Sequence, residues 1–178
     1  AGKDLQITDS TFSNNQAIAS DQAFGGAVLS AASTSIDNVL FEFNSIQLEE
    51  GLGYGGAVYA PPSVANDSFI AISEVKMYNN SATGLGGGLF VNNTASVDIE
   101  ASDITNNTAS YGGGIYLFSE EGQSNQTLTI QSMTFVDNSA SYGGGALYAS
   151  EDTLTQINAT DFTYQSNTAL YGNTTASD

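Results

Sequence analysis

The stretch NNTASYGGGIY, residues 106–116, occurs in closely related form at residues 137–148 as DNSASYGGGALY and at residues 79–90 as NNSATGLGGGLF. Each version contains three consecutive glycines, which neither the interior of a helix nor that of a strand favours. A phrase written three times marks an internal repeat, and internal repeats of this length are typical of solenoid proteins.

A longer pattern surrounds these phrases and recurs six times. It starts with an isoleucine that is followed five residues later by a large apolar residue. The six anchor pairs are Ile7/Phe12, Ile36/Phe41, Ile72/Met77, Ile99/Ile104, Ile130/Phe135 and Ile157/Phe162. The isoleucines are 29, 36, 27, 31 and 27 residues apart, which indicates fixed segments joined by loops of variable length.

Each copy continues with an amide three residues after the second anchor. These amides are Asn15, Asn44, Asn80, Asn107, Asn138 and, in the last copy, Gln165. A glycine block follows, and it is opened by Phe24, Tyr54, Leu85, Tyr111, Tyr142 and Tyr171. The block reads Gly-Gly-Ala in two copies and Gly-Gly-Gly in three.

The composition of each copy indicates short strands. Thr, Val, Ile, Tyr and Phe alternate with polar residues at period two, as at residues 70–72 and 128–130. A copy of about 29 residues with two or three strands matches one turn of a parallel β-helix, whereas a propeller blade needs about 40–50 residues. We therefore predict one all-β domain over residues 1–178, a parallel β-helix of six coils.

In that architecture equivalent residues of successive coils lie about 4.8 Å apart. We expect the isoleucines and the second anchors to form internal apolar ladders. We also expect an amide ladder of Asn15, Asn44, Asn80, Asn107 and Asn138, since each amide can bond the one above and below. Asparagine tolerates a left-handed backbone, so the ladder is assigned to a sharp corner, and the glycine block to a second close approach of the backbone.

Charge and composition limit the partners. The chain has nineteen acidic residues and only Lys3 and Lys76 as cations, with a formal charge of −17, so we predict no nucleic acid partner. The absence of a long apolar run argues against direct membrane insertion. There is no cysteine, so the fold contains no disulfides, and this leaves the compartment open.

The repeats resemble those of the polymorphic outer membrane proteins. The motif F-x-x-N appears at residues 12–15, 41–44 and 135–138, and G-G-A-V at 25–28 and 55–58. The resemblance implies right-handed β-helix coils and a role as a surface adhesin. Met77 and Ile104 replace the motif phenylalanine, and Gly88, Gly114 and Gly145 replace its alanine, so the resemblance carries the fold but not a receptor.

Seven N-x-[ST] acceptors for N-glycosylation are present: Asn66, Asn79, Asn92, Asn106, Asn125, Asn158 and Asn173. The residues Asn80, Asn107, Asn138 and Asn167 are followed by Ser/Thr-Ala and are not acceptors. Alternation along the chain turns Asn79 and Asn106 outward. Either the protein is a glycosylated exterior protein of a eukaryote, or an Asn- and Thr-rich bacterial coil contains acceptors without their being used.

Few residues are candidates for metal binding or catalysis. No calcium-loop pattern is present, and we expect no cofactor. Glu49–Glu50 and Glu120–Glu121 sit in protruding inserts, where they act as solvating charge or, as the alternative, bind Ca²⁺. Lys76 and Asp103 each precede a second anchor, so we expect them to stack as a surface ion pair.

An enzyme acting on acidic polysaccharides is disfavoured because the chain has no His or Arg. The candidate pair of catalytic carboxylates is Asp103 and Asp161, which share a repeat position two coils apart.

Two neighbouring ladders follow the glycine block, and only one can face inward. They are Leu29, Tyr59, Phe90, Tyr116 and Leu147, and beside them Val28, Val58, Leu89, Ile115 and Ala146. The outer ladder is either a stripe for lateral packing or sugar stacking, or is covered by an insert such as residues 60–69.

We expect an extracellular or cell-surface structural protein without enzymatic activity. The favoured interpretation is a glycoprotein subunit, one segment of a longer solenoid or of a filament, that associates with itself head-to-tail or laterally into a fibre or surface coat. The alternative is the passenger fragment of a bacterial adhesin that binds a host partner, and a polysaccharide-degrading enzyme is the least favoured class.

Overall fold

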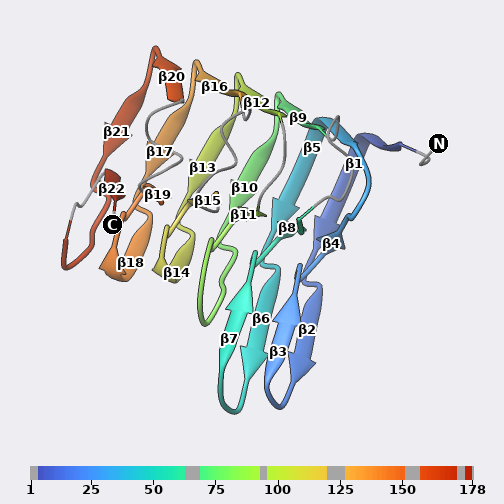
Figure 1. Ribbon diagram of the computed structural model, residues 1–178, viewed down its shortest axis with the longest axis vertical. Helices are drawn as coiled ribbons and strands as arrows, with labels where there is room; N and C mark the ends of the chain where they lie inside the picture. The colour runs from blue at the N-terminus through green and yellow to red at the C-terminus, as the bar shows by residue number, and fades with distance from the viewer. Residues whose placement is uncertain are drawn as a thin grey trace.

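The computed structural model describes residues 4–62, 69–92, 96–119, 127–150, 157–171 and 175–177. Over these ranges the chain consists of strands and turns in a parallel β-helix (Figure 1), which confirms the predicted fold class. The same ranges contain no helix with the length and apolarity needed to cross a bilayer.

The largest sheet contains both apolar anchors of every coil. Its strands that carry the first anchor are β1 (Leu5–Ser13), β5 (Thr34–Glu42), β9 (Phe69–Ser73), β12 (Ser96–Glu100), β16 (Thr127–Gln131) and β20 (Ile157–Thr160). The second anchors lie on β1, β5, β10 (Lys76–Tyr78), β13 (Asp103–Thr105), β17 (Thr134–Val136) and β21 (Thr163–Gln165). All pairs are parallel and in register, for example Ile36 with Ile72 and Met77 with Ile104.

A second sheet closes the coil after the glycine block. It consists of β4 (Val28–Leu29), β8 (Val58–Ala60), β11 (Leu89–Asn92), β15 (Ile115–Phe118), β19 (Leu147–Ala149) and β22 (Thr175–Ser177). Its strands pair in parallel, as the coils of a β-helix require.

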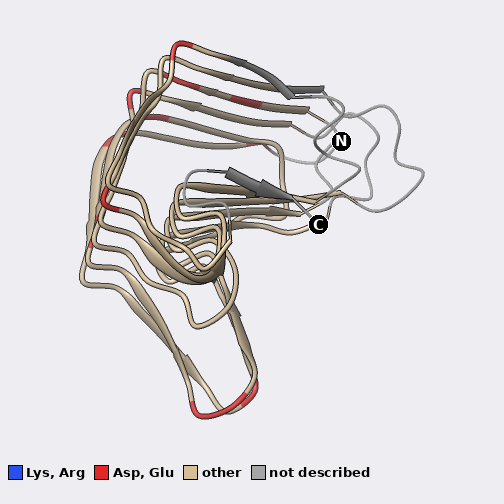
Figure 2. Cartoon of the chain, turned by 90° about the vertical axis from the view of Figure 1, so that its left-hand side faces the viewer, with Lys and Arg blue, Asp and Glu red and all other residues tan. Residues whose placement is uncertain are grey.

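Shorter strands lie between the two sheets. In the first two coils they are β2 (Gln16–Ala19) with β3 (Gln22–Phe24) and β6 (Ser45–Leu48) with β7 (Leu52–Tyr54), which we call the arms. The fourth and fifth coils have only β14 (Thr108–Tyr111) and β18 (Ser139–Gly143) in this place. The arms protrude from the stack, and Figure 2 shows acidic residues at their tip.

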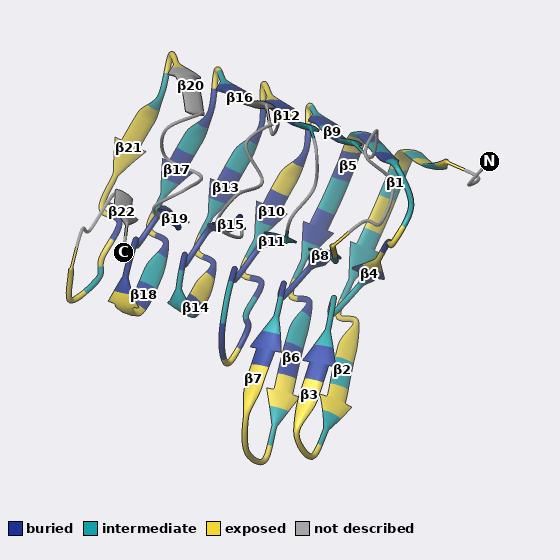
Figure 3. Cartoon of the chain, viewed as in Figure 1, coloured by how far each residue is buried: buried dark blue, intermediate teal, exposed yellow. Residues whose placement is uncertain are grey.

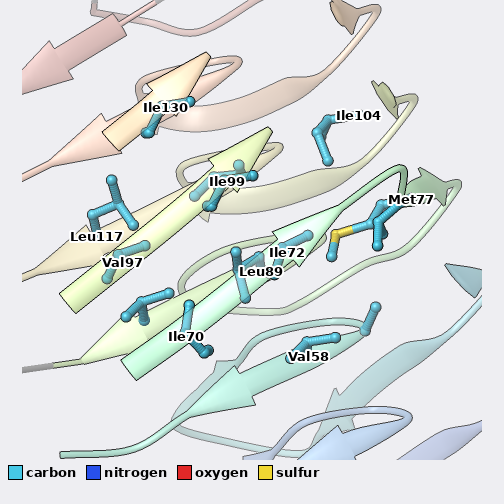
Figure 4. Packing of buried hydrophobic residues seen from close by; sticks show 14 of the residues in the cluster. Val58, Ile70, Ile72, Met77, Leu89, Val97, Ile99, Ile104, Leu117 and Ile130 are labelled. Carbon is cyan, nitrogen blue, oxygen red and sulfur yellow. The ribbon is translucent and has the colours of Figure 1, made fainter. Parts of the chain in front are cut away.

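The core lies between the two sheets. Ile36, Ile72, Ile99 and Ile130 are at most 2% exposed, and Phe41, Met77, Ile104 and Phe135 at most 1%. Val58, Leu89 and Leu117 of the second sheet face them (Figure 4). Both predicted apolar ladders are therefore confirmed in the interior coils, whereas Ile7 and Phe12 of the first coil are only partly buried. Figure 3 shows that buried residues concentrate in the stacked coils and exposed residues at the arm tips.

Two non-glycine residues per coil have a left-handed backbone and form two of its corners. One set follows the first anchor by two residues: Asp9, Asn38, Glu74, Ala101, Ser132 and Asp161, with φ between 47° and 57°. The other directly precedes the amide ladder: Asn14, Phe43, Asn79, Asn106, Asp137 and Ser166, with φ between 53° and 57°. The prediction that the ladder asparagines adopt this conformation was wrong. The preceding residue makes the turn, and the turn directs the asparagine into the interior.

The register differs from the prediction in the last coil. Ile130 pairs with Ala159 and Phe135 with Tyr164, so the anchor pair is Ala159/Tyr164 and not Ile157/Phe162. The ladder amide is consequently Asn167, and Gln165 is exposed. The six copies form about five turns and not six full coils, since six anchors bound only five intervals.

The fifth coil contains one extra residue. Ala109 pairs with Ala140, but Tyr111 pairs with Gly143, so Tyr142 is the insertion and the positive-φ glycine is Gly144. The shift carries through to the next strand, where Leu147 pairs with Ile115 and Tyr148 with Tyr116. Leu147 therefore faces inward, and the prediction that Ala146 belongs to the same ladder as Leu89 and Ile115 was wrong by one residue.

Neighbouring glycines of one block serve different purposes. A Cβ on Gly87 would lie 2.2 Å from the carbonyl oxygen of Gly113 in the next coil, and 2.6 Å from that of Thr108. A Cβ on Gly88 would lie 3.0 Å from the Gly114 oxygen and 3.1 Å from Met77 Sδ, and the second coil has buried Ala57 at this position. Only Gly87 is required by the approach of two backbones.

We predict that Gly87→Ala lowers the free energy of unfolding by about 3 kcal/mol, because the new methyl group forces two coils apart. The matched change Gly88→Ala should cost less than about 1 kcal/mol, since the Gly114 oxygen and the flexible Met77 side chain need move only slightly and the second coil already has an alanine, Ala57, at this position. Urea unfolding followed by circular dichroism measures both. Equal losses for the two variants would contradict this account of the glycine block.

Candidate functional site

The buried asparagines form one continuous ladder with a direction. Asn80 Nδ2 and the Asn80 N–H both donate to Asn107 Oδ1 at 3.0 Å, and Nδ2 also donates to the Phe41 carbonyl at 3.0 Å. Asn80 Oδ1 accepts the same pair of bonds from Asn44. Each interior amide is thus fully satisfied, which burial at 0% exposure requires.

The same bonds recur from Asn15 to Asn167. Asn15 donates to Asn44 at 2.8–3.0 Å, Asn107 to Asn138 at 3.0 Å, and Asn138 to Asn167 at 2.9–3.0 Å. Every side-chain oxygen faces the preceding coil. The backbone N–H and one Nδ2 hydrogen bond to the following coil, whereas the other Nδ2 hydrogen bonds to a carbonyl of the preceding coil, such as Met77 or Ile104. In the part of the chain that the structure describes, no donor reaches Asn15 Oδ1, and the only acceptor of Asn167 is the Phe135 carbonyl.

A groove lies on the outer face of the second sheet. Tyr59, Phe90, Tyr116 and Tyr148 point away from the core and are 3–7% exposed. They are covered by the residues that lead into the glycine blocks, Phe24, Tyr54, Leu85 and Tyr111. The outer ladder is thus the aromatic one, with Tyr148 and not Leu147 as its fifth-coil member, and it is packed against a second aromatic column.

The aromatic groove is the hollow between these two columns and has a volume of about 310 Å³. It is lined by Gln22, Phe24, Tyr54, Tyr59, Leu85, Phe90, Asn92, Tyr116 and Phe118. No lining residue carries a formal charge. The alternative prediction was that residues 60–69 cover the outer ladder. Of this insert, residues 63–68 lie outside the described residues.

The third coil differs from the two coils before it at the level of the groove. Asn44 and Tyr54 are ten residues apart, but Asn80 and Leu85 only five, so the third coil has no arm. Leu85 is also the one aliphatic residue in the column of Phe24, Tyr54 and Tyr111. At this level the ring planes turn as well: Tyr59 and Phe90 are 28° apart, whereas Phe90 and Tyr116 meet at 79°.

Asn92 and Tyr59 form the polar wall of the groove. Asn92 is hydrogen-bonded to Tyr59, and no protein donor reaches its buried Oδ1, so the bond is made by the Asn92 amide N–H. Burial raises the pKa of Tyr59 above the ordinary 10.0, a direction that the Asn92 bond opposes and neighbouring Tyr54 reinforces. The phenol is therefore kept neutral well above physiological pH.

The other predicted residues are distributed over the surface. Asn79 and Asn106 are exposed, as expected for glycan acceptors, whereas the Asn92 side chain is held in the groove. Asn66, Asn125 and Asn173 lie outside the described residues, and so does the side chain of Asn158. Glu49 and Glu50 are exposed at an arm tip, and Glu120–Glu121 lie outside the described residues.

The charged pairs differ from their predicted arrangement. Lys76 pairs in register with Asp103, as expected, but within the described ranges no Lys Nζ lies within 4.0 Å of a carboxylate oxygen, so the stacked positions form no ion pair. Asp103 aligns with Thr134 and Thr163, so Asp161 does not share its repeat position as predicted. Asp161 instead occupies a left-handed corner. Among the described residues, no three acidic side chains are placed to hold a metal ion.

These features define a parallel β-helix repeat protein. Three segments, residues 9–31, 101–117 and 132–150, match the Chlamydia polymorphic membrane protein repeat. The matched segments contain the corner asparagine and glycine block of the first, fourth and fifth coils. These matches, together with the parallel β-helix, confirm the resemblance to the polymorphic membrane protein repeats. Comparisons with curated proteins and with solved structures gave no significant match.

We predict that Tyr59→Phe reduces the sensitivity of the fold to alkaline pH. Because the pKa of Tyr59 is raised on folding, its contribution to stability is fully present below pH 10.0 and is lost as the pH rises through the folded-state value. The variant lacks this loss, so the fall in unfolding free energy above pH 10.0 should be shallower than in the wild type. At pH 7 it should be about 0.5–1.5 kcal/mol less stable, since Asn92 loses its partner.

Urea unfolding of both proteins, measured at steps of about one pH unit between about pH 7 and 11.5, gives the free energy of unfolding at neutral pH and its decrease at alkaline pH. Parallel stability curves above pH 10 would show that Tyr59 ionises equally in both states, contrary to this interpretation.

Proposed function

We propose that the protein is a non-enzymatic structural rod at the cell surface whose coils associate with like coils into a fibre or coat. The observation that supports this proposal is the directional amide ladder. An additional coil placed before Asn15 could donate two bonds to its Oδ1, and a coil placed after Asn167 could accept two. The coil that fits either end is one of the same type, supplied by further chain or by another molecule.

The apolar surface at the two end coils supports the same function. In the last coil Tyr171 is 70% exposed, whereas Tyr54, Leu85 and Tyr111 at the equivalent interior positions are half-buried. In the first coil Leu5, Ile7 and Phe12 are only partly buried. Stacking of the last coil of one molecule on the first coil of another is a head-to-tail contact, which continues into an open filament.

Asn79 and Asn106 would present glycans on the outside of such a rod. Both are exposed at the left-handed corner beside the buried ladder, where a glycan would not obstruct coil stacking. Glycosylation and assembly are separate parts of the proposal. A bacterial protein with this sequence would contain the same acceptor asparagines without carrying glycans on them, and could still assemble.

The second candidate is the passenger segment of an adhesin that binds a host partner. It is favoured by the match to the Chlamydia polymorphic membrane protein repeat, whose family is adhesin-type. In this function the stack is a spacer, and the arms with their acidic tips are the elements that reach outward.

Asn15→Leu tests the assembly. It replaces an exposed side chain and removes Oδ1, the oxygen that would accept hydrogen bonds from an added coil. We expect wild-type rods to lengthen with concentration, and the variant to need at least about tenfold more protein for the same length. Gln16→Ala, at the neighbouring exposed position, is the matched control and should behave like wild type. Sedimentation velocity and negative-stain imaging measure length, and intact mass of native material detects glycans.

Rods of a single length at every concentration, for wild type and variant alike, would refute self-association and favour the adhesin segment. An intact mass equal to that of the polypeptide would refute the glycoprotein part alone.

A further inference from the structure

The aromatic groove is independent of the two ends of the rod and of its proposed assembly. It lies along the side of the stack, across the first to fourth coils, and its rings are held by the coils above and below. Ring centroids are 5.1 Å apart between Phe24 and Tyr54 and 5.2 Å apart between Phe90 and Tyr116. The lining is therefore rigid before any ligand arrives, which lowers the entropic cost of binding.

The chemistry of the lining excludes several partners. The groove contains rings, one leucine, two amides and phenol hydroxyls, without a cation to neutralise an anion. The surrounding protein carries a formal charge of −17, so acidic sugars and phosphates are repelled. The floor is the face of a sheet and not its edge, so an extended peptide finds no backbone groups to pair with. What remains is a neutral ligand with apolar faces and hydroxyl groups.

The buried acceptor in the wall indicates what kind of hydrogen bond is needed. Among the described residues, none donates a hydrogen bond to Asn92 Oδ1, and an unpaired buried amide oxygen costs about 1–3 kcal/mol. A hydroxyl group on the ligand is a suitable donor, and the exposed Gln22 offers a second amide at the rim.

The spacing of the rings matches a sugar chain. Successive coils rise by about 4.8 Å, which is close to the length of one pyranose unit in an extended β-linked chain. Phe24, Tyr54 and Phe118 are the half-buried rings of the lining, and they offer the accessible ring faces that the apolar face of a sugar can meet. We infer that the aromatic groove binds a neutral β-linked glycan, with one sugar ring per coil.

Leu85→Tyr is the most direct test of this site. Tyr54 and Tyr111 occupy the same position in the adjacent coils, so a tyrosine at position 85 continues an existing column and should fold normally. Its ring would fill the hollow. Asn92→Ala removes the unpaired acceptor, and Ile18→Ser, at a 71% exposed arm position outside the groove, is the matched control.

The probes are the hexasaccharides of β-1,4-linked glucose and β-1,4-linked N-acetylglucosamine, with the α-1,4-linked galacturonate hexamer as the acidic comparison. Binding is followed by intrinsic tyrosine fluorescence, since the chain has nine Tyr and no Trp, and by calorimetry. We expect at least one neutral probe to bind, Leu85→Tyr and Asn92→Ala to weaken it at least about tenfold, and Ile18→Ser to leave it unchanged. Circular dichroism verifies that each variant is folded.

Three results would overturn the assignment. They are no binding of either neutral probe up to about 10 mM, equal binding of the acidic hexamer, and unchanged binding by folded Leu85→Tyr. A concentration-dependent dimer that Leu85→Tyr abolishes would instead identify a second copy of the chain as the occupant. None of these outcomes depends on whether the rods polymerise.

Discussion

The buried amide ladder is the constraint on which the rest of the structure depends. An asparagine at 0% exposure is tolerated only when its oxygen and both N–H groups are paired, and here the partners come from the coils before and after. Each coil must therefore place its asparagine directly over the previous one. This requirement defines a single vertical register. The apolar side chains of successive coils stack in that register, and the left-handed corners turn the chain so that each asparagine points inward.

The remaining features follow from stacking like on like. Isoleucine over isoleucine gives a core without cysteine, and glycine over glycine lets two backbones approach at the second corner. The same rule acts on the outside, where tyrosine and phenylalanine stack into two columns. The column that leads into the glycine blocks has a leucine, Leu85, in place of an aromatic residue, and at this level the two columns line a hollow on the side of the rod. Function in such a protein is to be sought where the repeat is broken.

The sequence predicted the fold well because every interior coil repeats the five-residue offset between anchors and the three-residue offset to the amide. It failed in the last coil because Ile157/Phe162 and Ala159/Tyr164 both satisfy the first offset. A slip of two residues preserves the inward and outward faces, so alternation does not distinguish the two registers. Only the buried amide does, since Asn167 has the geometry of the ladder and Gln165 has not.

The fifth-coil error has a different physical origin. Three consecutive glycines give no side chain by which to number them, so the extra residue at Tyr142 was invisible until Leu147 was found inside. The groove was missed for a related reason. Sequence shows that Leu85 replaces an aromatic residue, but not that two columns from different strands pack on each other. The polar partner of Tyr59 lies in the next coil, 33 residues away at Asn92, and no periodicity pairs them.

Exchange of the asparagine side-chain amide protons with solvent, followed by NMR, tests the ladder most directly. The account predicts that the Nδ2 protons of Asn44, Asn80, Asn107 and Asn138 exchange at least about 10³-fold more slowly than those of exposed Asn79 and Asn106. If the ladder amides exchanged as fast as Asn106, the asparagines would not be buried in one column, and the register described here would be contradicted.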